Sequence, residues 1–542
     1  MRTWLWRLLF VSLLCRVECD SATGNSSSGS LSIVIIYIVL FAFPLLCTGI
    51  GVLHTRGKVK RTVISYTLAD RSLTGTVGTM VMISTWICTG YLFGSAESVV
   101  TSGRGLLWTQ GPLGFSISFV MSSFLFCEQL REKDMITILD PMTEKFGVFI
   151  TPLLYLPCLL GEVLWIGMLV HSLRCFVTIV LGFSSPLIVY YVIVCCIIVP
   201  AVGGLYSIKY SGLTEFAVIV LFLLVSVASL GSSPYVGDIS AHRSSWLGTI
   251  EREEWGEWID ETLLIVFGGT CWQVYFQQML SCRTIEASRV MSLFTGLGTF
   301  LIGLMACLFG VFASTIDWSQ FGEIGSLAGN EENVVSYLVK YILPPLPRAI
   351  SLAGIIATIM GSFSGAIHSS GSEFVLAIYK ELIRRQASER EMLFVMRVFM
   401  VAISVAGVLL SLLMRSLYDY WVLTSDLIYV FVFPQLLLAI WLSKVVNTYG
   451  AFAAFFVTVL LRFGVGAQFV GVERVGVLPS WLPFRTLVVV VAMVVEVSVS
   501  VLFKFLIVRK GYSSLDCFEA FTPRRQIKKQ EKEKRSKRAS GN

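Results

Sequence analysis

Long apolar runs recur along almost the whole sequence. A run of about 20 apolar residues is what a helix needs to cross the hydrocarbon core of a bilayer. The runs here follow one another with no polar domain between them. Only 14% of the residues are charged, whereas an ordinary soluble domain has about 25%. The sequence therefore predicts one all-α polytopic membrane unit and excludes a soluble globular enzyme.

The charges of the loops set the direction of the spans. We place 13 spans, which start near Leu31, Thr74, Leu106, Val148, Pro186, Leu213, Leu263, Ser292, Arg348, Glu391, Trp421, Gly450 and Arg485. Basic loops alternate with acidic ones, and cytoplasmic loops carry the excess of lysine and arginine. We therefore expect a plasma-membrane protein with its N-terminus outside and its C-terminus in the cytoplasm.

The two ends of the chain carry signals of their own. In residues 1–19, Arg2 and Arg7 precede a short apolar core, which is typical of a cleaved signal peptide. Residues 20–30 would then be extracellular, and Asn25 begins an N-x-S/T sequon that we expect to be glycosylated. Residues 510–542 form a basic tail, compatible with a solvated segment or with contact to anionic lipid. Because residues 524–538 of this tail alone carry a net charge of +7, equal to that of the whole chain, no nucleic-acid partner is predicted.

Glycines interrupt two of the spans. Gly90 and Gly94 lie in the second span, and Gly268 and Gly269 lie in the seventh. Glycine costs ~1 kcal/mol in a helix interior, so these sites favour interrupted helices, although tight packing at small residues explains a single pair equally well. The two spans are five apart, as expected for two inverted five-helix repeats in residues 74–232 and 263–443 of a domain spanning 31–509.

Motifs for catalysis or cofactors are missing from the sequence. It contains no nucleophile elbow, Walker loop or paired zinc-ligand motif, and only four histidines. The 13 cysteines are scattered, mostly inside apolar runs. We therefore predict neither an enzyme nor a bound cofactor.

Three tryptophans stand inside spans. Trp86 and Trp272 flank the glycines of the two interrupted spans, and Trp165 lies deep in the fourth. Most of the others, Trp421 among them, stand near span ends or in loops, as interfacial belts do. Core packing explains one such tryptophan best, but two that flank helix breaks favour ligand contact. Aromatic faces attract cations, above all a quaternary ammonium, so a choline-like ligand is predicted.

At the same residues the sequence resembles the high-affinity choline transporters of the sodium:solute symporter family, over residues 31–509. The resemblance rests on Thr85-Trp86, Gly90-Tyr91, Ala96-Glu97, residues 111–115, Leu139-Asp140-Pro141, Gly161-Glu162 with Trp165, residues 202–207, Trp272-Gln273, Tyr275-Phe276-Gln277, Asp317-Trp318, Ser425-Asp426-Leu427, residues 433–436 and residues 447–450. It implies a leucine-transporter-type inverted-repeat fold with 13 spans. It also implies choline uptake driven by sodium, with chloride dependence.

The resemblance assigns roles to particular residues. Its aromatic cage falls on Trp86, Phe115, Trp165 and Trp272, with Phe115 in place of a tyrosine. Its sodium site falls on the carbonyls of Tyr91 and Gly94 together with Thr358 and Ser362. Two intramembrane carboxylates, Glu97 and Glu162, are candidates for gating or relay, and helix packing explains them equally well.

Four positions depart from the family pattern. Phe93, Gly212, Gly361 and Ser364 stand where Asn, Asp, Ser and Asp are expected. Gly361 removes a hydroxyl ligand of sodium, and Gly212 and Ser364 remove carboxylates. We therefore predict a divergent transporter with an intact cage and weakened sodium coupling. The alternative is a non-transporting membrane sensor that binds the same cation without coupling it to an ion gradient.

Overall fold

The computed structural model describes residues 27–521 except 270, 323, 415–416, 465–478, 480, 511, 513–514 and 519. The predicted signal peptide, the sequon at Asn25 and most of the basic tail lie outside these residues. The described part is built from helices, and its β pairing is limited to an isolated bridge between Leu73 and Cys282. The predicted all-α fold is confirmed.

Nine helices in the described residues are long and apolar enough to cross a membrane. They are α2 (Ser27–Thr55), α9 (Thr151–Leu181), α10 (Pro186–Gly203), α11 (Leu205–Gly231), α15 (Ile285–Ser314), α17 (Pro345–Glu373), α18 (Glu389–Ser411), the combined α19 (Leu417–Leu427) and α20 (Phe433–Trp441), and α22 (Phe484–Lys504). The bent pair α4 (Gly75–Trp86) and α5 (Thr89–Val100) makes a tenth. Shorter helices include α6 (Gly111–Leu125), α13 (Trp255–Leu263), α14 (Gln273–Leu280) and α21 (Thr448–Gly464). The predicted count of 13 spans is not established by these lengths.

Both predicted helix interruptions are present. The axes of α4 and α5 differ by 59° across Ile87 and Cys88. The Cys88 thiol caps the new helix by accepting a hydrogen bond from the Tyr91 amide, at 3.3 Å. In the other interrupted span, α13 continues as the short π-helix η3 (Leu264–Gly268), and α14 begins only after Trp272, whose backbone is extended. Helix ends inside a bundle leave backbone groups free for ligands, as in inverted-repeat transporters.

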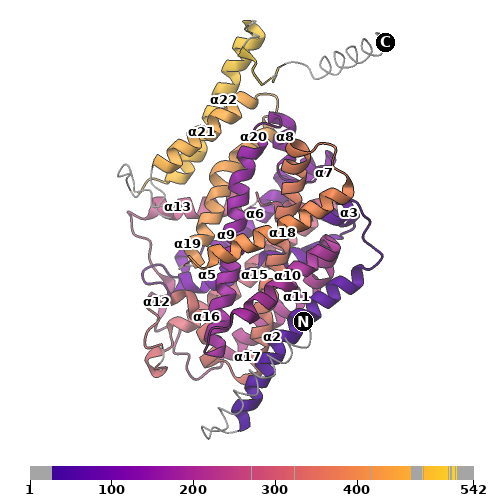
Figure 1. Ribbon diagram of the computed structural model, residues 1–542. Coiled ribbons are helices and arrows are strands. Elements are labelled where there is room, and N and C mark those ends of the chain that lie inside the picture. Colours follow the sequence, from indigo (N-terminus) through magenta and orange to yellow (C-terminus); the bar gives the residue numbers. More distant parts are fainter. Residues whose placement is uncertain are drawn as a thin grey trace.

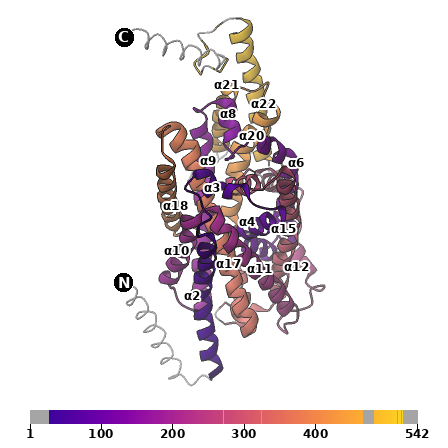
Figure 2. The ribbon, with the colours of Figure 1, turned by 90° about the vertical axis from the view of Figure 1, so that its right-hand side faces the viewer.

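Helix α17 occupies the centre of the bundle. It packs against α11, α10, α2, α4 and α9. Of its most apolar 18-residue stretch, 89% is buried. Many of its inward residues are serine, glycine or alanine, which let neighbouring backbones approach closely. In both views α21 and α22 stand at the end of the bundle where α8 (Asp140–Phe146) lies (Figures 1 and 2). The opposite end carries α12 (Arg243–Leu247) and α16 (Val334–Tyr337) (Figure 1).

An aromatic pocket and a polar site beside one helix break

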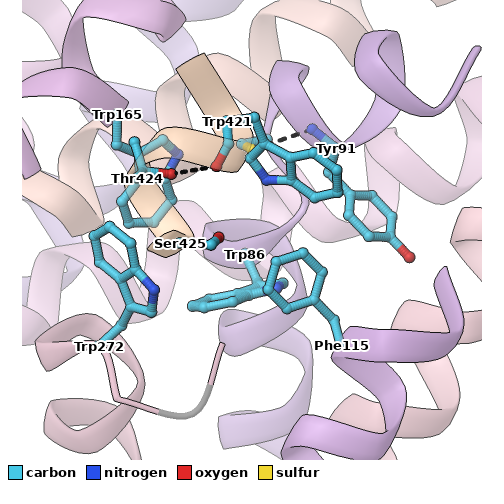
Figure 3. A pocket seen from close by; sticks show the side chains of 9 residues that line it. Trp86, Tyr91, Phe115, Trp165, Trp272, Trp421, Thr424 and Ser425 are labelled. Carbon is cyan, nitrogen blue, oxygen red and sulfur yellow. Dashed lines mark hydrogen bonds between the residues drawn. The ribbon is translucent and has the colours of Figure 1, made fainter. Parts of the chain in front are cut away.

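Residues from both helix interruptions line one central pocket. Figure 3 shows its walls, which consist of Trp86, Cys88, Tyr91, Phe115, Trp165, Trp272, Trp421, Thr424 and Ser425. About 340 Å³ of space, open solvent included, lies among and in front of these side chains. All four rings of the cage expected from the sequence are among them. None of the nine lining residues carries a charge, so the pocket offers π faces and a few hydroxyl or thiol groups.

The rings of the cage form a chain of edge-to-face contacts. The centroid of Trp86 lies 5.2 Å from that of Phe115, with the planes at 81°, and 6.1 Å from that of Trp165, at 62°. The centroid of Trp165 in turn lies 5.5 Å from that of Trp272, at 70°. Such tilted pairs are favourable beyond their buried area. The rings therefore hold one another in orientation.

Glycines make room for these large side chains. A Cβ atom added at Gly161 of α9 would lie 3.1 Å from Cη2 of Trp272. One added at Gly111, the first residue of α6, would lie 2.6 Å from Cη2 of Trp421. The second distance is too short for any Cβ, so a side chain at 111 would displace the indole. Both glycines belong to segments that carried the resemblance, and both leave the space that a tryptophan ring of the pocket occupies.

Trp421 is a correction to the sequence analysis, which placed it in an interfacial belt. Its indole is buried, with its centroid 5.5 Å from that of Phe115 and 6.4 Å from that of Tyr91. The reason is that α19 begins at Leu417, which sets Trp421 one turn inside the helix rather than at its end. Thr424, one turn later, donates its hydroxyl to the Trp421 carbonyl at 2.7 Å. Sequence reasoning also missed Ser425, although that residue opens one of the matched segments.

A polar site lies where α4 breaks beside α17. The Ser362 hydroxyl donates to the Ile87 carbonyl at 3.4 Å. The Ser84 carbonyl approaches Gly361 so closely that a Cβ atom there would collide with it. Thr358, one turn earlier on α17, is buried and donates to the Gly354 carbonyl at 2.9 Å. Two backbone oxygens, of Ser84 and Ile87, thus face two consecutive residues of α17.

The pair of carbonyls expected from the sequence, Tyr91 and Gly94, does not match this geometry. Both residues lie inside α5, beyond the break, where carbonyls serve the helix itself. The Tyr91 side chain lines the aromatic pocket and donates its hydroxyl to the Thr299 carbonyl at 2.7 Å. The free carbonyls lie earlier in the chain than expected because the helix breaks at Ile87 and Cys88, before the glycines that indicated the interruption. Thr358 and Ser362 remain at the site as expected.

Glu215 of α11 is a buried carboxylate that the sequence analysis overlooked. It is 1% exposed, and its Oε2 lies 3.0 Å from the position that a Cβ atom at Gly361 would take. Among the described residues, neither carboxylate oxygen has a hydrogen-bond partner of normal geometry. The Ser211 hydroxyl, one turn earlier on α11, is nearby. The signal was available, because an acid three residues after Gly212 stands on the same face of an intramembrane helix.

The other departures from the family pattern separate in space. A Cβ atom at Gly212 would lie 2.9 Å from the Ser84 hydroxyl, so this glycine belongs to the polar site. Ser364 donates to the Cys196 carbonyl at 2.9 Å, toward α10. Phe93 packs against Phe176, with centroids 6.2 Å apart. The polar site therefore has glycines at 212 and 361, with the acid at 215 between α4, α11 and α17.

Glu97 and Glu162, the candidates for gating or relay, do not line the aromatic pocket. Glu162 accepts a hydrogen bond from Ser369 of α17 at 3.4 Å, and it lies near a second buried carboxylate, Glu373. Glu97 is buried on α5. His368 is held by Gln277, at 3.0 Å, and by the Tyr66 carbonyl, at 3.2 Å, so it ties α17 to its neighbours.

A bundle with two interrupted helices around a central pocket defines a secondary transporter of the inverted-repeat class. The sequence profile of the sodium:solute symporter family matches residues 66–458. The chain therefore belongs to this family. It is 31% identical to the Drosophila melanogaster high-affinity choline transporter 1, covering 86% of this chain and 77% of the relative. It is 33% identical to the Caenorhabditis elegans protein of the same name, covering 77% and 75%.

Further comparisons agree on family and fold. The human high affinity choline transporter 1 is 29% identical, with 90% of this chain and 88% of the relative covered. Among solved structures, a sodium-coupled sialic acid symporter in a substrate-bound outward-open state superposes with a TM-score of 0.72 at 13% identity. That alignment covers 86% of this chain and 98% of the symporter. The predicted leucine-transporter-type architecture is thus confirmed at the level of the fold, and the chain is a transporter rather than an enzyme.

Proposed function

We propose that this protein takes up choline, or a similar quaternary ammonium, by symport with sodium. The observation that carries the proposal is the pocket of Trp86, Phe115, Trp165 and Trp272, which has no charged lining residue. A quaternary ammonium has no N–H group for a carboxylate to bind, whereas a π face attracts it by ~2 kcal/mol when desolvated. The named choline transporters among the relatives support the same substrate class.

For sodium, we propose a site between α4 and α17. Its oxygen ligands are the carbonyls of Ser84 and Ile87 with the hydroxyls of Thr358 and Ser362, and the Glu215 carboxyl would supply a nearby negative charge when the cation binds. Carbonyl, hydroxyl and carboxylate oxygens are the ligands that hard cations prefer. The negative charge of Glu215 would compensate for the acid missing at 212, which adjoins the same site. Transport would also require chloride, to which we assign no residue.

This arrangement explains how sodium would assist choline binding. Ser84 and Ile87 stand on either side of Trp86 in the chain, and Trp86 is the last residue of α4. A cation held by both carbonyls fixes the backbone that carries this indole. Trp86 in turn contacts Phe115 and Trp165, so the cage is stabilised in its binding geometry. Sodium and choline then share a coupling free energy, and each tightens the binding of the other.

We further propose the plasma membrane as the location, with the N-terminus outside and the C-terminus in the cytoplasm. Residues 131–145, which include Arg131, Lys133 and Lys145, reach into α8, which lies with α22 at one end of the bundle (Figure 1). The acidic segment 317–332 leads into α16 at the other end. This distribution of charge follows the positive-inside rule.

Uptake of radiolabelled choline into cells that express the protein tests the function. We expect saturable uptake in sodium medium, little uptake when an impermeant organic cation replaces sodium, and reduced uptake when gluconate replaces chloride. The sensor alternative predicts choline binding without uptake in any medium, and no relative described above supports it. Uptake that is equal with and without sodium would contradict the proposed symport.

A further inference from the structure

We propose that His171, Cys175 and Glu332 form a zinc site at the outer end of the bundle. His171 and Cys175 are four residues apart on α9, so they stand on one face of the helix. Glu332 comes from the short turn η5 (Glu331–Asn333), in the acidic segment that precedes α16. One ligand atom from each side chain can be chosen so that all three lie within 4.8 Å of one another. The proposal is independent of choline or sodium binding.

The separations fit a tetrahedral zinc ion. Nε2 of His171 lies 3.6 Å from Oε2 of Glu332 and 3.5 Å from Sγ of Cys175. Zinc binds nitrogen and carboxylate oxygen at about 2.0–2.2 Å and sulfur at about 2.3 Å, which places tetrahedral ligand atoms roughly 3.3 to 3.7 Å apart. Two of the three separations already meet this requirement. The ligand atoms of Cys175 and Glu332 lie within 4.8 Å of each other, and water would complete the coordination.

The donor set favours zinc over the abundant hard cations. A thiolate and an imidazole are ligands of zinc and other late transition metals, whereas calcium and magnesium select oxygen. On binding, the Cys175 thiol loses its proton to solvent, and the S–H bond is replaced by a zinc–sulfur bond. The thiolate and the Glu332 carboxylate then balance the two positive charges of the ion.

Neighbouring groups orient two of the ligands. Nδ1 of His171 lies 3.3 Å from the Ser411 carbonyl at the end of α18. Nη2 of Arg174 lies 3.2 Å from the same nitrogen, which accepts a hydrogen bond when it faces the guanidinium. Zinc binding requires the other tautomer, in which Nδ1–H donates to the Ser411 carbonyl and Nε2 presents its lone pair to the metal. Arg174 donates to the same carbonyl at 3.3 Å and keeps that contact. Asn333 donates to Oε1 of Glu332 at 3.4 Å, which leaves Oε2 for the ion.

The site is reachable and connects separate elements. His171 is buried, but Cys175 and Glu332 are partly exposed, so an ion can enter from the bundle end. A bound ion would tie η5 to α9, the helix that carries Trp165. Sequence reasoning missed the site because it looked for paired motifs close in sequence. Here the third ligand is supplied by a distant loop.

Zinc binding to the purified full-length protein, carrying an affinity tag without histidines, tests the proposal. Zinc is titrated in competition with a chromophoric chelator, and cobalt is used as a spectroscopic substitute that reports thiolate ligation. We expect one zinc ion per chain and a thiolate-to-cobalt absorption band. Cys175→Ser should abolish the band, and both Cys175→Ser and Glu332→Gln should weaken zinc binding at least ten-fold. Zinc should also raise the unfolding temperature of the parent protein but not of these variants.

Two matched variants serve as controls. Glu331→Gln neutralises the adjacent acid of η5, and Cys517→Ser removes an exposed thiol remote in sequence from the site. Both should bind zinc like the parent. The proposal fails if the parent binds zinc no more tightly than Cys175→Ser, or if Glu331→Gln loses as much affinity as Glu332→Gln. Because no choline is present, the result does not depend on the transport function.

Discussion

The strongest test of the coupling mechanism is Glu215→Gln, which removes one negative charge and keeps the shape of the side chain. Oε2 of Glu215 lies 3.0 Å from the Cβ position at Gly361, which itself abuts the Ser84 carbonyl oxygen. A cation bound to that carbonyl at about 2.4 Å therefore lies at most roughly 8 Å from Oε2, and about 6 Å is a representative separation. Two opposite unit charges at ~6 Å attract by about 3 kcal/mol at an effective dielectric of ~20.

Both charges lose hydration at this site, and that cost offsets part of the attraction. We therefore expect the variant to bind sodium more weakly by about 1.4 to 2.8 kcal/mol. This corresponds to a ten- to hundred-fold rise in the sodium concentration that half-saturates choline uptake. Choline affinity at saturating sodium should change little, because Glu215 does not line the aromatic pocket. Uptake measured across a sodium titration, with surface expression monitored, gives both quantities.

The matched control is Glu496→Gln. Glu496 is also a fully buried carboxylate without a hydrogen-bond partner, but it lies on α22, outside the polar site. Its neutralisation should leave the sodium dependence unchanged. A parental sodium dependence in Glu215→Gln would refute the role of this carboxylate. The weakened coupling expected from Gly212, Gly361 and Ser364 would then stand without compensation.

Three further predictions follow from the pocket, the polar site and the topology. Replacing any one of Trp86, Trp165 or Trp272 with Ala should weaken choline binding at least ten-fold, or ~1 to 2 kcal/mol, with Phe milder; parental binding in all three Ala variants would refute the cage. Gly361→Ser should reduce sodium-dependent uptake rather than strengthen it, because its Cβ collides with the Ser84 carbonyl; stronger sodium dependence would show that the helices separate to admit the hydroxyl. Asn25→Gln should increase gel mobility in glycosylating cells, and a C-terminal epitope should stay inaccessible on intact cells; an accessible epitope contradicts the assigned orientation.

Hydropathy and helix breaking are local properties of the chain. The sequence alone therefore determined the membrane spans and the interrupted helices. Apolar runs of about 20 residues predicted the membrane spans, and glycines flanked by tryptophans located both interrupted helices. The positions of Trp86 and Trp272 beside those interruptions already indicated a central aromatic site. The resemblance to a known family added Phe115. These residues needed no knowledge of how the helices rotate against one another.

Contacts between helices depend on how each helix is rotated about its axis and how far it is shifted along it. A helix that is apolar on all sides has no distinct face, so its sequence predicts neither quantity. Only the tertiary structure therefore placed Trp421 in the pocket and the carbonyls of Ser84 and Ile87 beside α17. The same is true of Gly361, which the sequence presents as a lost ligand. In the folded chain it is the place where two backbones and the Glu215 carboxylate meet, because no side chain there keeps them apart.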